Sequence, residues 1–371
     1  MNKTEPIRIL HVISSMQRAG SQRLLINLYR EMDHNSIQFD LVENKGEEET
    51  EWDAEIRQGG GRIYHCPRLQ KNNILQYIKW WNRFYKEHGG EYKIIHGHSG
   101  GSAPVYLAIA KKHGLYTIAH SHSAVASGYR VVGFNTLRLV RFVADFYIAC
   151  SNLAAYNRFG RRIACSTEKC CILKTAINAD EFAFHSEDRN EARIEFGVEG
   201  KLCVGTVGRI CPEKNPAGII HIIEKCVQRN NNFKFLWCGD GELRKSVELE
   251  IAKRNLKDHV IFLGVRNDVN RILCAMDVFI LPSLYEGLAN AAIEAQASGL
   301  PCLCSDTVDK ETRAIELCQF IPLDDYDKWA DAVMKSTICE NRENYFFEVK
   351  KAGYDIREAA QYLSGLYQSK N

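Results

Sequence analysis

The alternation of short apolar runs with longer amphipathic stretches constrains the fold of this chain more than any other feature. In the first half, apolar runs of strand length occur at 7–13, 37–42, 61–66, 92–98, 115–121 and 146–151. Stretches with helical spacing separate several of them, at 21–32, 73–88, 102–114 and 135–145. Continuous apolar strands separated by helices are typical of a parallel sheet that is covered on both faces. The pattern therefore predicts an α/β fold.

The same alternation begins again after a polar, charge-rich stretch at 178–196. Further strand-like runs occur at 202–209, 233–241, 260–264, 277–283 and 300–305. Helical stretches are predicted near 215–229, 242–255 and 288–298. A chain of 371 residues is long enough for two domains of about 150 residues each. We predict two doubly wound α/β domains with a boundary near 180–190, whose ligands lie beyond the carboxyl ends of the strands.

Charge and cysteine content exclude several classes of protein. Lys and Arg total 48 and Asp and Glu total 46, so the net charge is +2, without the strong basic excess of a dedicated nucleic-acid binder. No apolar stretch has the length of a membrane-spanning helix, and the polar start of the chain predicts no secretory signal. We therefore expect a cytoplasmic protein. Its 14 cysteines are scattered through apolar runs without metal-site spacing, which favours reduced, buried thiols.

The segment from Ser283 to Gly299 is the most informative one for function. Glu286 lies in a loop after a strand, and Glu294 lies in the early turns of a helix that begins near Asn290. If helical, their eight-residue separation spans at most about 12 Å, which matches the two ends of a nucleotide-sugar. The helix N-terminus would offer N–H groups to the diphosphate between them. The alternative is an ordinary strand–loop–helix unit with two solvated glutamates.

Two basic residues follow the first strand of the second domain. Arg209 ends the strand, and Lys214 lies in a proline-containing turn before the next helix. A planar guanidinium and a compact ammonium group suit a diphosphate, whose negative charge grows as it leaves. The alternative for this pair is an ion pair with Glu213 at the start of the helix.

Gly20 and Ser21 occupy the corresponding place after the first strand of the chain. The glycine would allow close approach of the backbone to an anion, and the helix from Ser21 would present N–H groups. The alternative is an ordinary turn with a serine N-cap.

Four histidines lie near the carboxyl ends of two predicted strands. His120 ends one strand directly and His122 follows it, while His96 and His98 repeat the pattern one strand earlier. A histidine in this place is positioned to hydrogen-bond a sugar, and we favour His120 with His122 as the alternative. Structural or solvated roles remain open for each. Because no carboxylate cluster accompanies the histidines, we predict no metal site.

Several motifs, in order along the chain, resemble those of the retaining glycosyltransferases of family 4. Glu286 and Glu294, within SLYEGLANAAIEAQASGLP, are similar to the donor-site signature of that family. HVISSMQRAGSQRLLINLYREM resembles its N-terminal glycine-rich loop and first helix, although the usual Gly-Gly-Ala-Glu reads Ala-Gly-Ser-Gln here. VGRICPEKNP, GDGELR and LGVRNDV follow in the usual order, and IIHGHS and IAHSHS are similar to the branch that builds bacterial capsule and exopolysaccharide.

The resemblance implies a GT-B fold, in which two Rossmann-like domains face each other across a cleft. Residues 1–185 would form an acceptor-binding domain, residues 186–355 a nucleotide-sugar-binding domain, and residues 356–371 a helix that packs back on the first domain. It implies transfer of a hexose or N-acetylhexosamine from a nucleotide-sugar, expected to be UDP-linked, to a saccharide or polyprenyl-diphosphate-linked acceptor. No cofactor or metal is expected, because protein groups neutralise the phosphates.

The resemblance also implies roles for individual residues. Glu294 would hold ribose hydroxyls and Glu286 donor-sugar hydroxyls, while His120 would contact the sugar near its C6 hydroxyl. Arg209 and Lys214 would stabilise the departing diphosphate, assisted by the loop at Gly20. The remaining residues assigned to the donor site are Ser21, Arg266, Gly287, Leu288 and Asn290. Glu242 and Arg266 are expected on the nucleotide side of the cleft, and the alternative for both is a surface ion pair.

Basic and aromatic residues also gather in the first half of the chain, and the members considered are Lys79, Trp80, Trp81, Arg83, Arg130, Arg138, Arg141, Arg158, Arg161 and Arg162. They are either a solvated helix face over core tryptophans or a surface that contacts anionic lipid on the inner face of the membrane and a lipid-linked acceptor.

Two other functions remain as alternatives. One is a sugar-nucleotide epimerase on the same fold, and the other is a non-catalytic, degenerate transferase that scaffolds polysaccharide assembly. The intact Glu286 and Glu294 segment argues against both. ILKTAIN at 172–178 departs from the family's usual Pro-Asn-Gly-Ile-Asp-like run, which affects the interdomain hinge rather than the donor carboxylates.

Overall fold

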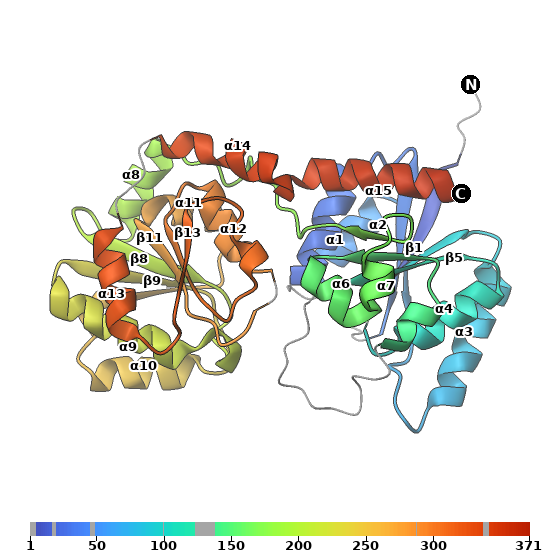
Figure 1. The fold of residues 1–371 in the computed structure, drawn as a ribbon, viewed down its shortest axis with the longest axis horizontal. Helices are drawn as coiled ribbons and strands as arrows, with labels where there is room; N and C mark the ends of the chain where they lie inside the picture. Colours follow the sequence, from blue (N-terminus) through green and yellow to red (C-terminus); the bar gives the residue numbers. More distant parts are fainter. Residues whose placement is uncertain are drawn as a thin grey trace. The chain divides into compact units, whose positions relative to one another are not determined.

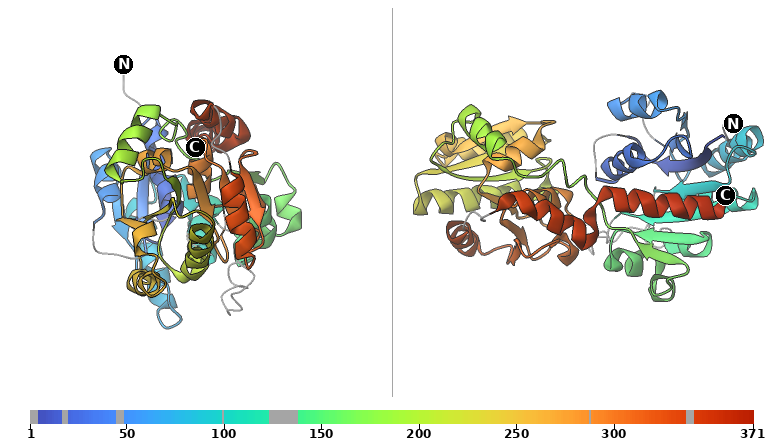
Figure 2. Two further views of the ribbon diagram at one scale, coloured as in Figure 1. Left: turned by 90° about the vertical axis from the view of Figure 1, so that its left-hand side faces the viewer. Right: turned by 90° about the horizontal axis from the view of Figure 1, so that it is seen from above.

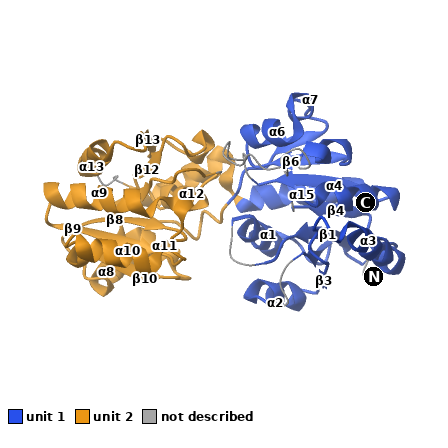
Figure 3. Ribbon diagram, turned by 90° about the horizontal axis from the view of Figure 1, so that it is seen from below, with its two compact units in different colours: residues 1–176, 356–371 blue, residues 177–355 orange. Residues whose placement is uncertain are grey.

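The structure is a computed structural model (Figure 1, Figure 2). It describes residues 5–16, 20–44, 49–98, 100–122, 138–286, 288–336 and 341–371. The chain divides into two compact units (Figure 3). Unit 1 comprises residues 1–176 and 356–371, and unit 2 comprises residues 177–355. The chain therefore leaves unit 1 once and returns to it for the last helix.

Unit 1 is built on a seven-stranded sheet in which all neighbouring strands are parallel. Its strands are β1 (Ile7–Ile13), β2 (Ile37–Glu43), β3 (Ile63–His65), β4 (Ile94–Gly97), β5 (Tyr116–Ser121), β6 (Phe146–Ala149) and β7 (Cys170–Ile172). Their order across the sheet is β3-β2-β1-β4-β5-β6-β7. The strand order therefore reverses between β1 and β4.

Helices cover both faces of this sheet (Figure 1). They are α1 (Gly20–Glu31), α2 (Glu51–Gln58), α3 (Ile74–His88), α4 (Ala103–Lys112), α6 (Asn152–Phe159), α7 (Arg161–Ala164) and α15 (Ile356–Lys370), with the short 3-10 helix η1 (Leu139–Phe142). On one face α1, α2 and α15 bury residues such as Leu25, Ile56 and Leu363 against β1 and β2. On the other face α3, α4 and α6 pack around Trp81 and Tyr106.

Unit 2 repeats the same architecture with six strands. They are β8 (Leu202–Val207), β9 (Phe233–Cys238), β10 (Val260–Gly264), β11 (Val278–Leu281), β12 (Cys302–Ser305) and β13 (Cys318–Ile321). Neighbours are again parallel, in the order β10-β9-β8-β11-β12-β13. Here the order reverses between β8 and β11. The first six strands of both sheets thus follow the Rossmann order, for which ligands bind beyond the carboxyl ends at the reversal.

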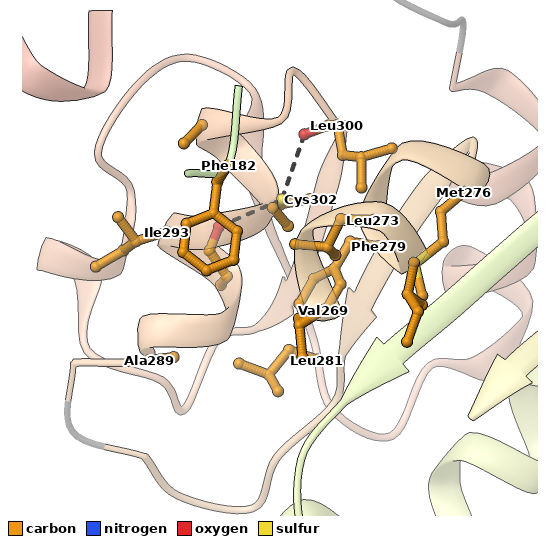
Figure 4. Close-up of a cluster of buried hydrophobic side chains, with 14 of the residues drawn as sticks. Phe182, Val269, Leu273, Met276, Phe279, Leu281, Ala289, Ile293, Leu300 and Cys302 are labelled. Atoms are coloured by element: carbon orange, nitrogen blue, oxygen red, sulfur yellow. Dashed lines mark hydrogen bonds between the residues drawn. The ribbon is translucent and has the colours of Figure 1, made fainter. Parts of the chain in front are cut away.

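The helices of unit 2 form a layer on each side of its sheet. They are α8 (Ser186–Glu195), α9 (Pro216–Arg229), α10 (Arg244–Lys253), α11 (Val269–Ala275), α12 (Asn290–Ala297), α13 (Tyr326–Lys335) and α14 (Tyr345–Val349), followed by a π-turn (Lys350–Tyr354); short 3-10 helices lie at Pro212–Lys214, Lys257–His259, Lys310–Thr312 and Arg342–Asn344. One layer, shown in Figure 4, packs Phe182, Leu273 and Ile293 against Phe279 of β11. The Cys302 thiol lies in the same layer and donates to the Leu300 carbonyl oxygen at 3.3 Å.

The structure departs from the sequence analysis in three places. The helix predicted over 135–145 lies partly outside the described residues, and it is wrong at its C-terminal end, because the 3-10 helix η1 ends at Phe142. There the Asp145 amide donates to the Thr117 carbonyl oxygen, and the Tyr147 hydroxyl donates to the Arg141 carbonyl oxygen that a longer helix would use. The polar stretch 178–196, for which no helix was predicted, contains α8. The short edge strands β7 and β13 were not predicted, because three or four residues carry little periodicity.

The charges of α8 explain why a polar helix belongs to unit 2. Arg189 and Arg193 both form ion pairs with Asp277, which is 5% exposed and precedes β11. Asp277 also accepts a hydrogen bond from the Cys203 amide of β8. A buried carboxylate needs such partners, because its desolvation is otherwise strongly unfavourable. The helix is therefore fixed to the sheet by charge as well as by apolar contact.

The cysteines of the described residues are all free thiols, and most are buried, as the sequence predicted. None of the helices described is both long enough and apolar enough to cross a membrane.

Candidate active site

Two loops at the reversal point of unit 2 are joined to each other by backbone and side-chain hydrogen bonds. Asn215 adopts a left-handed conformation (φ 53°), caps α9 by accepting from the Gly218 amide at 3.0 Å, and donates to the Pro282 carbonyl oxygen at 3.1 Å. Two residues further along the second loop, the Leu284 amide donates to the Glu213 carbonyl oxygen at 2.9 Å. The loop after β8 and the loop after β11 therefore form one structural element.

This element brings Lys214 and Glu286 into contact. The Lys214 Nζ lies 2.6 Å from the Glu286 Oε2, and their side chains are 22% and 23% exposed. The lysine stem passes close to Gly208, where a Cβ would lie 3.3 Å from Lys214 Cε. Gly239 in turn approaches Gly208 closely, because a Cβ on Gly239 would lie 2.0 Å from the Gly208 carbonyl oxygen. The glycines of VGR and GDG thus make room for this charged pair.

The segment after Glu286 adds further polar groups at the same edge. Glu286 forms a backbone bridge with Val308, which fixes the loop beside the end of β12. Asn290 begins α12, and Glu294, in the second turn of that helix, is 1% exposed. The Ser283 Oγ and the Asn290 Oδ1 are both buried without a hydrogen-bond partner in the described part of the chain. Buried polar atoms of this kind are usually satisfied by water or by a ligand.

The other predicted donor-site residues have different surroundings. Arg209 is exposed and forms no ion pair with any described residue, and Glu242 is exposed in the loop after β9. Arg266 is held by Asp268, with its Nη2 at 2.6 Å from Oδ2, and by Glu195 at 3.4 Å. Leu288 packs against the apolar core of unit 2. Gly287 and Arg130 lie outside the described residues.

Another hollow in unit 2 lies elsewhere on the edge. It measures about 760 Å³ and lies beyond β12 and β13, among Asp306, Asp324, Asp325, Asp327 and Lys225. Four carboxylates and one ammonium group make this hollow electrostatically unsuited to a diphosphate. The reversal point, with its two basic groups, suits a diphosphate better.

In unit 1, the start of α1 and the histidines line one pocket. This pocket measures about 190 Å³, and its lining includes Ser21, His98, His120, His122 and Arg158. Ser21 Oγ donates to Gln22 Oε1 at 2.7 Å, and Gln22 Nε2 donates to the Ser15 carbonyl oxygen at 2.9 Å. Gln22 therefore ties the start of α1 to the loop after β1. Gly20 begins the helix, and nothing within 4 Å would obstruct a Cβ there.

A fifth histidine, which the sequence analysis did not select, joins the four predicted ones. His11 of β1 is the register partner of His96 in β4, and His98 follows β4; His120 lies near the end of β5, and His122 follows that strand. Two hydrogen-bonded chains result. In one, His11 Nδ1 lies 2.9 Å from His98 Nε2 and His98 Nδ1 lies 2.7 Å from His122 Nε2. In the other, the Tyr367 hydroxyl lies 2.6 Å from His96 Nδ1 and His96 Nε2 lies 3.2 Å from His120 Nδ1.

Burial keeps these imidazoles neutral. It lowers the pKa of His11 to about 3 and, together with the charge of Arg158, the pKa of His122 to about 4. Burial and the neighbouring histidines lower the pKa of His96, His98 and His120 well below the usual range. Each imidazole therefore carries one N–H donor and one acceptor nitrogen.

The same nitrogens lie close enough together to be possible metal ligands. His11, His96 and His98, and likewise His98, His120 and His122, have ligand atoms within 4.8 Å of one another. Two nitrogens bound tetrahedrally to zinc at about 2.05 Å are about 3.3 Å apart. The observed separations of 2.7 and 2.9 Å along the first chain are those of hydrogen bonds. The geometry therefore fits imidazole chains better than a metal centre.

Comparison with known families supports the site at the reversal point of unit 2. The family model for glycosyl transferases group 1 matches residues 188–346, which include Lys214, Glu286 and Glu294. The putative glycosyltransferase EpsF of Bacillus subtilis is 28% identical over 99% of this chain and 97% of its own length. The chain is a glycosyltransferase, and its residues 188–346 are similar to the group 1 family.

Two more comparisons place this glycosyltransferase among characterised proteins. An Escherichia coli enzyme, UDP-Gal:alpha-D-GlcNAc-diphosphoundecaprenol alpha-1,3-galactosyltransferase, is 26% identical over 89% of this chain and 88% of its own length. The crystal structure of Anabaena Alr3699/HepE in complex with UDP superposes with a TM-score of 0.80 at 15% identity, covering 98% of this chain and all of that one. The fold of the glycosyltransferase is thus GT-B, as the sequence predicted.

The buried histidines of the glycosyltransferase predict a stability that depends on pH. Their pKa values are lowered in the folded state, so the unfolded chain binds more protons below about pH 6.5 and stability is lost as the pH falls. Each histidine that stays neutral contributes a slope of roughly 1.4 kcal/mol per pH unit. The free energy of unfolding in urea, followed by tryptophan fluorescence at pH 7, 6 and 5, is expected to fall steeply.

One substitution makes this measurement specific. Because His11 is fully buried, His11→Asn is expected to reduce the slope by roughly one proton. In the wild type, a change in the free energy of unfolding of less than about 1.4 kcal/mol per pH unit, which corresponds to one proton, would show that the histidines are not held neutral in the folded protein.

Proposed function

We propose that the protein is a retaining glycosyltransferase that moves a hexose or N-acetylhexosamine from a UDP-sugar to a saccharide or polyprenyl-diphosphate-linked acceptor during surface polysaccharide synthesis. The observation that carries the proposal is the contact of Lys214 with Glu286 at the reversal point of unit 2. Two similar proteins support the choice of substrates. Anabaena Alr3699/HepE was crystallised with UDP and with UDP-glucose, and the Escherichia coli relative acts on a diphosphoundecaprenol-linked sugar.

In this proposal the Lys214–Glu286 pair changes partners when the donor binds. Without ligand, each charge is compensated by the other at 2.6 Å. With ligand, the ammonium group would turn to the diphosphate and the carboxylate to the sugar hydroxyls. Both groups would exchange one charge-assisted hydrogen bond for another, so neither is left without a hydrogen-bond partner at any stage. Arg209, which has no ion pair among the described residues, would add a second cation for the diphosphate.

The chemistry assigned to the protein is positioning and charge stabilisation. Glu294 would hold the ribose hydroxyls, and the start of α12 would present its N–H groups to a phosphate. Arg209 and Lys214 would stabilise the leaving diphosphate, which makes a divalent metal unnecessary for that step. We propose that the acceptor attacks from the face that the diphosphate leaves, and that a diphosphate oxygen takes the acceptor's proton. This course retains the anomeric configuration without a side-chain nucleophile.

Unit 1 is assigned the acceptor, and its surface fits a lipid-linked one. The elements η1, α6 and α7 contact one another and expose large apolar side chains, with Phe142 at 70%, Leu153 at 50% and Leu139 at 48%. The basic side chains beside them on these elements are Arg138, Arg141, Arg161 and Arg162. The one acid in 138–165, Asp145, is paired with Lys111. Exposed apolar groups flanked by cations favour a membrane surface with anionic headgroups. Trp81, which the sequence analysis considered for the same surface, is instead fully buried in the core of unit 1.

Donor binding tests the proposed function. Saturation-transfer NMR across UDP, GDP and their common sugars is expected to show binding of UDP and of at least one UDP-sugar. Glu294→Ala is expected to weaken this binding about tenfold or more, because a buried carboxylate partner of the ribose is lost. Glu199→Ala, at an exposed position of the same unit, is the matched control. A folded wild-type protein that binds no nucleotide would contradict the proposal and favour a non-catalytic scaffold.

Membrane docking is tested separately by sedimentation with vesicles. Binding to vesicles that contain anionic phospholipid is expected, with little binding to neutral vesicles. Reversing two charges in Arg161→Glu/Arg162→Glu is expected to reduce binding at least about tenfold, since each cation near such a surface contributes about 1 kcal/mol. Lys253→Glu/Lys257→Glu in unit 2 makes the same change of charge elsewhere. Equal losses in the two double variants would mean that the η1–α6–α7 surface is not the docking surface.

A further inference from the structure

The two imidazole chains of unit 1 differ in how they end. The chain His11–His98–His122 ends at two nitrogens, His11 Nε2 and His122 Nδ1, that have no hydrogen-bond partner among the described residues. The chain His96–His120 ends at His120 Nε2 on one side and at the hydroxyl of Tyr367 on the other. Tyr367 belongs to α15, the last helix of the protein, and is fully buried.

A hydroxyl at the end of such a chain can determine in which direction its hydrogen bonds run, that is, which nitrogen of each imidazole donates and which accepts. Because each neutral imidazole has one donor and one acceptor nitrogen, the direction of one hydrogen bond fixes the direction of all the others. The side-chain hydroxyl of Tyr367 has one hydrogen bond within the described residues, the one to His96 Nδ1 at 2.6 Å. Burial raises the pKa of Tyr367 well above its usual range, so the hydroxyl keeps its proton.

The two directions leave different groups unsatisfied. If Tyr367 donates to His96 Nδ1, then His96 Nε2–H donates to His120 Nδ1, and the one group left over is the N–H at His120 Nε2. If Tyr367 accepts instead, its own proton is buried without an acceptor, and His120 Nε2 is left with an unused lone pair as well. Buried polar groups without partners are unfavourable, so the first direction is preferred. The group left over then belongs to a residue that lines the pocket.

We infer that Tyr367, acting through His96, fixes the tautomer of His120 in which Nε2 carries the proton and offers a hydrogen-bond donor to a ligand oxygen in the pocket of unit 1. Tyr367 and His96 are therefore positioning residues. His120 is a donor to an oxygen of the bound substrate rather than a base that removes a proton from it. The assignment to a sugar oxygen rests on the proposed function, whereas the tautomer does not.

The inference also distinguishes His120 from His122. No hydrogen-bond partner among the described residues sets the direction of the His11–His98–His122 chain at either end, so no buried hydroxyl fixes the tautomer of His122; the charge that acts on His122 is that of Arg158. A group that must present a donor to every incoming sugar is better placed at His120, where the direction is set by a buried hydroxyl. We therefore assign the sugar contact to His120.

Nitrogen NMR of the full-length protein with ¹⁵N-labelled histidine tests the tautomer directly. Long-range proton–nitrogen correlations show which ring nitrogen of a histidine is protonated, and His96→Gln and His120→Gln assign the two signals by their loss. In the wild type, His96 and His120 are both expected to be protonated at Nε2. In Tyr367→Phe, both signals are expected to shift toward a mixture of tautomers. Tyr362→Phe makes the same change on the same helix at a side chain 45% exposed, and is expected to shift neither.

Ligand affinity provides the second measurement. Tyr367→Phe is expected to weaken binding of UDP-glucose or UDP-galactose about tenfold while leaving the affinity for UDP unchanged, because the sugar oxygen loses a preorganised donor. A wild-type His120 protonated at Nδ1, or a Tyr367→Phe protein with wild-type histidine signals, would overturn the inference. A shifted tautomer with unchanged UDP-sugar affinity would overturn the role at the sugar. Failure of the wild type to bind any nucleotide, with the predicted tautomers present, would instead refute the proposed function.

Discussion

The reversal of strand order beside the first strand of each sheet brings together the residues to which this protein's chemistry is assigned. Since all neighbouring strands are parallel, every loop that follows a strand emerges at one edge, and the reversal separates the loops of two adjacent strands. In unit 2 these are the loops after β8 and β11, which carry Lys214 and Glu286. In unit 1 they are those after β1 and β4, beside the five histidines. Residues that are 72 positions apart in sequence meet because of this topology.

Buried polar groups find their partners in different ways at the carboxyl edges of the two sheets. Unit 2 places an acid against a base, so that both charges are compensated before a donor binds. Unit 1 instead buries imidazoles that stay neutral and satisfy one another in chains. The first arrangement suits a charged diphosphate, and the second suits an uncharged sugar whose hydroxyls need defined donors. This division agrees with a transferase that holds the nucleotide in one unit and handles sugar in the other.

Much of this arrangement could be predicted from sequence because it depends on local pattern. Apolar runs and helical spacing predicted most of the strands and helices, and the order of the motifs predicted the family and its GT-B fold. The left-handed cap at Asn215, the contact of His11 with His98 and the contact of Tyr367 with His96 were missed, because each joins residues distant in the chain. For Asn215 the signal was present, since an asparagine directly before a proline is typical of a helix start. The predicted helix over 135–145 ends early, at Phe142, because of hydrogen bonds of Asp145 and Tyr147 that no periodicity reveals.

Hydrogen–deuterium exchange with and without UDP measures the central claim most directly, because it locates the nucleotide on the chain. The account predicts that UDP slows amide exchange in the loop at 208–216 and in the segment 283–296. Both segments form the edge where β8 and β11 end. Protection confined to the acidic hollow at 322–327, or to unit 1 alone, would contradict the assignment of the nucleotide to the reversal point of unit 2.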